Sequence, residues 1–155
     1  MIVFKPTLGI VQDTELDFEL LSFIFTKVFN AKERVELKVE KSRNRNSFSG
    51  YYHGSKLIRI FVYENATLRY FISTLLHEVR HHYQFEVFGD KINTLHESYR
   101  SYYNSPEEVD ARKMEKITGD VCKLYRTYKS IEKKKEELGI DSFKELGYNL
   151  GVRTN

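Results

Sequence analysis

Two histidines and a glutamate near the middle of the chain have the types and spacing of a metal-dependent hydrolytic site. Residues His77-Glu78-Val79-Arg80-His81 form an H-E-x-x-H motif. On an α-helix, His77 and His81 lie one turn apart on the same face, where both imidazoles can bind one zinc ion. Glu78 lies about 100° from His77 around the helix, beside the metal but off the line of its ligands. That is where a general base can reach an attacking water.

A catalytic zinc ion usually has three protein ligands and a fourth position for water. No further histidine follows at the spacing of a third ligand, and Cys122 is isolated in the sequence. The best source of the third ligand is therefore a carboxylate of the segment 106–112. Its candidates are Glu107, Glu108 and Asp110.

These motifs resemble those of the small gluzincin metallopeptidases, which include the single-domain minigluzincins. The peptidase domain of the ImmA/IrrE type is a relative of that group. The resemblance covers about residues 57–116 and rests on H-E-x-x-H, an aromatic-Gln pair, a Tyr-rich stretch and Glu-x-Asp-Ala: His77–His81, Tyr83-Gln84, Tyr99–Tyr103 and Glu108–Ala111. The Asn that often follows this Ala in the ImmA/IrrE group is replaced by Arg112, so that subgroup is not assigned.

The resemblance implies a zincin-like fold and a zinc-dependent metallopeptidase acting on peptide or protein substrates. It implies that the zinc ligands are His77, His81 and Glu108, and that the general base is Glu78. A second interpretation of Glu108 stays open, because Ser105-x-x-Glu108 is also a capping box, in which this carboxylate binds the Ser105 amide. If Glu108 is a zinc ligand, Asp110 or Glu107 could support a zinc-bound histidine without binding the metal.

Three tyrosines precede the segment that carries the third ligand: Tyr99, Tyr102 and Tyr103. A phenol at this place can donate a hydrogen bond to the oxyanion of a tetrahedral intermediate, and Tyr103 is the favoured candidate. The alternative is that the three rings cover an edge of the hydrophobic core.

The elements that must position these residues are predicted as follows. Thr67 or Asn65 caps a helix over 68–88 that carries the motif and ends at Gly89. Ser105-Pro106 starts a last long helix, which continues to Gly139 with one face on the core. The residues between the two helices, 91–104, are predicted to form a loop.

The first half of the chain is richer in strand patterns. Short strands are expected at 2–4 and 9–11. A helix is expected to begin at 13–15 and to run to Phe29, and a half-buried strand follows over 34–40. Residues 51–52 and 56–63 flank His53-Gly54, a pattern typical of a hairpin. The chain is therefore predicted to be α+β, with a small mixed or antiparallel sheet packed on an N-terminal helix, the motif helix and the long C-terminal helix.

Length and composition limit the possible functions. The 155 residues are expected to form one domain (1–155), and 41% hydrophobic residues suffice for one core. A single cysteine and no apolar leader or membrane segment favour a soluble, cytoplasmic protein without disulfides. The net charge of +3 gives little support for nucleic-acid binding, although residues 41–60 hold five basic and no acidic side chains.

Two alternatives to the peptidase therefore remain. One is a catalytically silent module in which zinc only joins two helices, and the other is a nucleic-acid binder that uses the basic segment 41–60. A strand over 57–63 could in addition accept an extended peptide along its edge.

Overall fold

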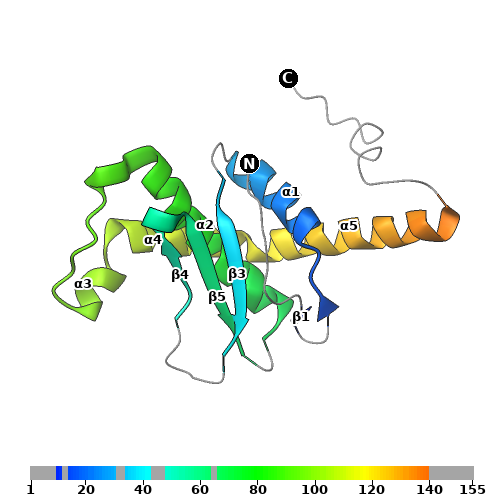
Figure 1. The fold of residues 1–155 in the computed structure, drawn as a ribbon, viewed down its shortest axis with the longest axis horizontal. Helices are drawn as coiled ribbons and strands as arrows, with labels where there is room; N and C mark the ends of the chain where they lie inside the picture. Colours follow the sequence, from blue (N-terminus) through cyan, green and yellow to red (C-terminus); the bar gives the residue numbers. More distant parts are fainter. Residues whose placement is uncertain (1–9, 12–13, 31–33, 43–47, 64–65, 140–155) are drawn as a thin grey trace.

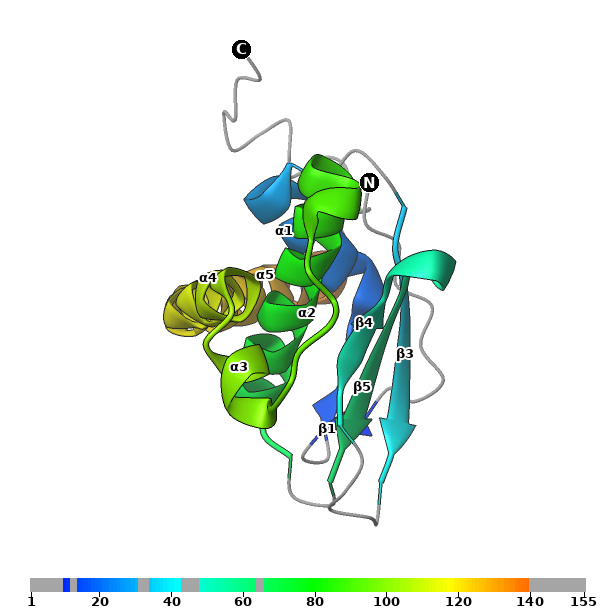
Figure 2. The same ribbon diagram turned by 90° about the vertical axis from the view of Figure 1, so that its left-hand side faces the viewer.

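The computed structural model describes residues 10–11, 14–30, 34–42, 48–63 and 66–139. Within them the fold is α+β, as the sequence predicts, with helices on one side of a small mixed sheet (Figures 1 and 2). The sheet has the order β3-β5-β4, with bounds β3 Glu36–Lys41, β4 Gly50–Tyr52 and β5 Leu57–Val62. A separate antiparallel pair joins β1 (Ile10–Val11) to β2 (Thr14–Glu15). The strand expected at 2–4 lies outside the described residues.

Strand β5 is the centre of the sheet. It runs parallel to β3, with Val39 opposite Ile60, and antiparallel to β4, with Tyr52 opposite Leu57. The hairpin between β4 and β5 is confirmed, but its turn is longer than the expected His53-Gly54. A 3-10 turn at His53–Ser55 is followed by Lys56, which has a left-handed backbone (φ 48°).

Helix α1 (Phe18–Phe29) begins later than predicted. Residues Thr14–Glu15 belong to β2, and Asp17 caps the helix by accepting a hydrogen bond from the Leu20 amide at 2.9 Å. An Asp immediately before the apolar run satisfies the free amides of the first turn better than the more distant Thr14. The helix ends at Asn30, which adopts the left-handed conformation common after the last turn.

Helix α2 (Leu68–Phe88) has the predicted bounds, and Thr67 rather than Asn65 is its cap, with a 3.0 Å hydrogen bond from the Tyr70 amide. It is followed by a 3-10 turn at Gly89–Lys91. The segment expected as a loop also contains a short helix, α3 (Tyr99–Tyr103).

The last helix is divided in two, which corrects the single long helix of the prediction. Helix α4 spans Pro106–Met114, a 3-10 turn covers Glu115–Ile117, and α5 spans Thr118–Leu138. At the break, the Thr118 hydroxyl donates to the Glu115 carbonyl at 2.5 Å, so a side chain competes for the backbone acceptor. Figure 1 shows the end of α5 reaching beyond the other described elements.

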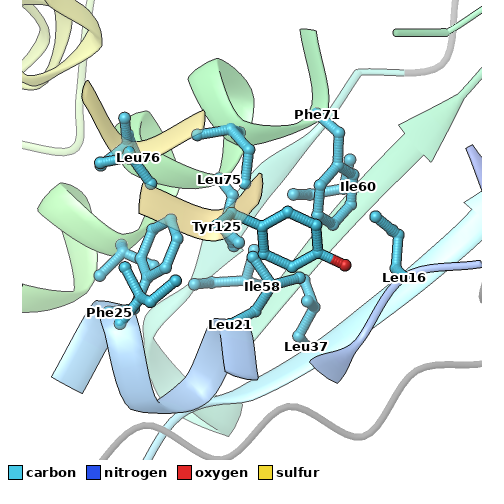
Figure 3. Close-up of a cluster of buried hydrophobic side chains, with 14 of the residues drawn as sticks. Leu16, Leu21, Phe25, Leu37, Ile58, Ile60, Phe71, Leu75, Leu76 and Tyr125 are labelled. Carbon is cyan, nitrogen blue, oxygen red and sulfur yellow. The ribbon is translucent and has the colours of Figure 1, made fainter. Parts of the chain in front are cut away.

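One hydrophobic core joins the sheet to the helices that cover it. Buried residues alternate along the strands, as at Leu37 and Val39 of β3 and at Ile58 and Ile60 of β5. They meet one face each of α1, α2 and α5, with Tyr125 among the other buried side chains (Figure 3). Labelled members of the cluster are Leu16, Leu21, Phe25, Leu37, Ile58, Ile60, Phe71, Leu75, Leu76 and Tyr125. Cys122 of α5 is buried in the same core.

Candidate metal centre

Helix α2 presents two opposite faces, and the two histidines of the motif lie on the one turned away from the core. Its apolar face buries residues such as Phe71 and Leu75 against the sheet. The other side packs against α4. There the Nε2 atoms of His77 and His81 are 3.1 Å apart, as expected for residues separated by one helical turn.

Glu108 comes to these histidines from α4. Its Oε1 lies 3.0 Å from Nε2 of His81, and its Oε2 lies 3.3 Å from Nε2 of His77. The carboxylate is buried between the two rings.

The alternative role of Glu108 as half of a capping box is only partly realised. The Ser105 hydroxyl caps α4 by accepting a hydrogen bond from the Glu108 amide at 3.3 Å. The Ser105 amide, however, donates to the Tyr102 carbonyl at 3.0 Å and does not need the carboxylate. One serine cap therefore starts α4 and leaves the Glu108 side chain to the histidines.

These three side chains form a cluster that could hold a metal ion. One ligand atom from each lies within 4.8 Å of the others. For metal–ligand bonds of 2.0–2.1 Å, ligand atoms at the corners of a tetrahedron are about 3.3 Å apart. The 3.1 Å between the two Nε2 atoms is close to this value, and the 3.0 and 3.3 Å contacts join these atoms to the two different oxygens of the Glu108 carboxylate.

The second nitrogen of each histidine is held by an acceptor. Nδ1 of His77 lies 2.8 Å from Oε1 of Glu115, in the 3-10 turn after α4. Nδ1 of His81 lies 2.9 Å from Oε1 of Gln84. The Gln84 amide nitrogen in turn donates to Oδ2 of Asp110 at 2.9 Å and to the Glu107 carbonyl at 3.0 Å.

This outer set of hydrogen bonds determines where the imidazole protons are. A carboxylate can only accept, so Nδ1 of His77 carries the proton that it donates to Glu115. The Gln84 amide gives both its donors to Asp110 and Glu107, so its oxygen faces His81. In the neutral form of each ring, Nε2 then carries a lone pair, so a cation bound beside both Nε2 atoms would also lie next to Glu108.

The charges of the cluster agree with this assignment. Burial raises the pKa of Glu108, but hydrogen bonds from His77, His81 and Tyr102 outweigh it and hold that pKa well below its usual range. Burial lowers the pKa of His77, and the opposing carboxylates of Glu108, Glu78 and Glu115 outweigh it and raise that pKa. The pocket therefore favours an ionised Glu108 and a positive charge between the side chains.

Glu78 lies beside the cluster with a different environment. It is only 6% exposed, and burial raises its pKa above the ordinary value against the opposing effect of His81 and His77. The backbone of Tyr51, in β4, contributes a hydrogen bond to its carboxylate. A carboxylate with a raised pKa is suited to accept and return a proton near neutral pH.

A cleft of about 250 Å³ opens next to these groups. Glu78, His81 and Glu108 lie on its inner side, and its outer wall comes from β4 and from the segment between α2 and α4. Residues of the outer wall are Ser49, Gly50, Tyr51, Ile92, Asn93, Thr94, His96 and Tyr102.

The structure brings Tyr102, and not Tyr103, to the cleft. The Tyr102 phenol makes a hydrogen bond with Glu108, and burial together with this carboxylate raises the Tyr102 pKa. The Tyr103 ring lies instead against the guanidinium of Arg112, with 3.7 Å from Cζ to the ring centroid. Among the described residues that line the cleft, Tyr103 is not present.

Two supporting residues were not predicted from the sequence as partners of the histidines. Glu115 lies seven positions after Glu108, on the same side of the helix axis, and this spacing is a signal that could have identified it. Gln84 was noted as part of a motif, but its contact with His81 depends on the fold. Asp110 reaches His81 only through Gln84, whose amide nitrogen it accepts from.

The remaining histidines lie apart from the three ligand atoms. His82 is buried, with Nδ1 2.9 Å from the Tyr51 hydroxyl, and His53 stacks on Phe85 with centroids 4.3 Å apart. His96 packs against Tyr102 in the wall of the cleft.

The basic segment is partly neutralised. Arg59 forms an ion pair with Glu40 at 2.6 Å, while Arg43 and Arg45 lie outside the described residues. In the part of the chain that the structure describes, no helix is long and apolar enough to cross a membrane.

Comparisons of the chain with models of protein families, with curated proteins and with solved structures found no match.

Proposed function

We propose that this protein is a zinc-dependent metallopeptidase with a zincin-like fold. The observation that carries the proposal is the cluster of two imidazoles and one carboxylate, in which both histidines have their Nδ1 atoms held by acceptors. Such support on the far side of the ring is typical of histidines that bind a metal. The resemblance of His77–His81 and Glu108–Ala111 to the gluzincin motifs supports the same function.

The donor set fits zinc, since two imidazoles and one carboxylate are the ligands of many catalytic zinc ions. Bound by His77, His81 and Glu108, zinc would supply a Lewis acid that lowers the pKa of water and polarises a peptide carbonyl. The side chains of the chain divide the remaining work between them.

Glu78 accepts the proton of the attacking water and passes it to the leaving amine. Its raised pKa suits both steps, because the group must take up a proton and then release it. Tyr102, at the cleft wall, is the phenol best placed to donate a hydrogen bond to the oxyanion.

The substrate would lie in the cleft as an extended peptide along β4. The predicted acceptor, the strand over 57–63, is the central strand β5, which pairs with β3 on one side and β4 on the other. Strand β4 is one of the two edge strands of this sheet, and its residues Gly50 and Tyr51 line the cleft. An edge strand can pair with a peptide backbone through main-chain hydrogen bonds.

The metal content of purified variants tests the proposal. We expect about one equivalent of zinc in the wild-type protein and a large loss in His81→Ala and Glu108→Gln. The control His53→Ala removes a histidine that stacks on Phe85, and it should keep its zinc. Metal-free wild-type protein, purified without chelator and then dialysed against zinc, would contradict the proposal.

Activity is tested with a peptide library and Glu78→Gln. This variant keeps the shape of the side chain, so we expect a normal fold and zinc content but a loss of hydrolysis of at least about 100-fold. Zinc binding without hydrolysis of any peptide by the wild type would favour the silent zinc module instead.

A further inference from the structure

Helix α3 carries Tyr102 to the cleft, although none of its side chains is buried. Tyr99, Tyr102 and Tyr103 are 76%, 41% and 45% exposed. A helix of this length has little stability of its own, and most helices depend on a buried apolar face. Other contacts must therefore hold α3 in place.

Arg112 of α4 supplies the most extensive of these contacts. Its Nη2 donates to the Tyr103 carbonyl at 2.6 Å, and its Cζ lies over the Tyr103 ring, 3.7 Å from the ring centroid. The same guanidinium places Nη1 3.7 Å from Oε2 of Glu108. One side chain thus touches the backbone of α3, a ring of α3 and the carboxylate of the metal cluster.

The position of the Tyr102 phenol depends on that backbone. Tyr102 precedes the residue whose carbonyl Arg112 holds, and it lines the cleft together with Glu108. A shift of the 102–103 backbone would carry the phenol away from Glu108, because no buried residue of α3 fixes it.

We propose that Arg112 is a positioning residue, which holds α3 on α4 so that Tyr102 stays in the wall of the cleft beside Glu108. The proposal rests on the proposed function only in taking Glu108 as a metal ligand. The contact of Arg112 with Tyr103 requires a planar group that packs on a ring and donates hydrogen bonds in fixed directions. Arginine provides such a group and lysine does not.

The competing role is purely electrostatic. Arg112 would then only offset the negative charge of Glu108, and any cation at this place would do the same. Arg112→Lys separates the two roles, since it keeps the charge but loses the stacked, directed contact with Tyr103. Lys113→Gln is the matched control, because it removes an exposed charge from the next position of α4.

Hydrogen exchange of the metal-free full-length protein measures the hold directly. We expect the amides of residues 101–105 to exchange at least about tenfold faster in Arg112→Lys and Arg112→Gln, and at the wild-type rate in Lys113→Gln. Amides of α2 serve as the internal reference for an intact fold. Wild-type protection of α3 in Arg112→Lys would overturn the proposal.

A second variant approaches the same contact from α3, in case substitution of Arg112 disturbs the fold. Tyr103→Ala removes the stacked ring but keeps the backbone carbonyl, so we expect an intermediate increase in exchange confined to α3. No increase in this variant would overturn the role of the stacked ring.

Zinc affinity then tests whether Arg112 acts through Tyr102. We expect Arg112→Lys and Tyr102→Phe to weaken zinc binding by similar factors, about tenfold, in competition with a chromogenic chelator. The double variant should be no weaker than either single one, and additive losses would show that Arg112 does not act through Tyr102. If the wild type binds no zinc, the metallopeptidase proposal fails, while the exchange experiment still decides whether Arg112 holds α3.

Discussion

Two buried glutamates line one cleft, but their surroundings shift their pKa values in opposite directions. Burial raises the pKa of Glu108, but its partners His77, His81 and Tyr102 outweigh burial and lower that pKa, so the ionised form is favoured. Glu78 is buried with fewer donors, and its pKa is raised. A difference of this kind is what separates a metal ligand from a group that exchanges protons.

A third glutamate, on the sheet, gives a prediction about pH. Arg59 and Lys38 lower the pKa of Glu40 from 4.5, against a smaller effect of burial. A carboxyl whose pKa is lower in the folded state adds stability above its unfolded pKa and loses it as the pH falls through the folded value. We therefore expect Glu40→Gln to lower the free energy of unfolding at pH 7 by less than about 1 kcal/mol. In urea titrations the difference from wild type should begin to shrink below about pH 4.5 and vanish only when the pH lies below the lowered pKa of Glu40.

Glu36→Gln on the same strand is the control for this prediction. Glu36 pairs with Arg34 at 3.6 Å, and both side chains are about half exposed, so its removal should have little effect at either pH. An equal loss of stability in the two variants would show that the bond between Glu40 and Arg59 contributes nothing specific.

How far the site follows from the sequence differs from residue to residue. The separation of His77 and His81 matches one helical turn, so a local rule places them together. The role of Glu108 was ambiguous, because a glutamate at this position of a helix can complete a capping box or bind a metal. The fold decides between these roles, since the Ser105 amide donates to the Tyr102 carbonyl and does not need the Glu108 carboxylate. Which of Tyr102 and Tyr103 lines the cleft depends on the orientation of α3, and the sequence pattern does not predict that orientation.

At the scale of elements, Asp17 joins two helices. Its Oδ1 caps α1, its Oδ2 pairs with Lys129 of α5 at 3.2 Å, and its amide donates to the Tyr125 hydroxyl at 2.9 Å. We expect Asp17→Ala to reduce the free energy of unfolding by about 1–2 kcal/mol through the lost cap. Urea denaturation followed by circular dichroism measures this.

Asp17→Asn separates the cap from the ion pair. Asparagine still caps a helix but carries no charge for Lys129, so this variant should retain most of the stability that alanine loses. If Asp17→Asn lowers the free energy of unfolding as much as Asp17→Ala does, the ion pair with Lys129 rather than the cap is the contact that stabilises the protein.

The elements themselves were predictable where their ends have local signals. The cap at Thr67 and the glycine at position 89 define α2, and both agree with the sequence. The break between α4 and α5 was missed because the competing hydroxyl of Thr118 is a weak signal within a continuous helical pattern. The parallel pairing of β3 with β5 joins strands that are separated in sequence by the whole of β4, so only the tertiary fold determines it.

For the whole molecule, the candidate ligands link α2 to α4 across the turn at 89–91 and helix α3. Any ion that binds the folded state alone stabilises it according to its concentration. We expect zinc at 1,000 times its dissociation constant to add about 4 kcal/mol and to raise the melting temperature by roughly 10 °C, with reversal by a chelator. Thermal unfolding with and without zinc measures the shift.

His81→Ala should melt at the same temperature with and without zinc. An equal zinc-dependent shift in this variant would mean that the stabilising ion binds elsewhere on the chain.

The buried thiol of Cys122 has a practical consequence for studies of this protein. It is the one cysteine of the sequence, it lies on α5 within the core, and burial raises its pKa. A thiol in this state reacts slowly with alkylating reagents until α5 separates from the core. The rate at which Cys122 of the unsubstituted protein is alkylated therefore measures how often the core opens.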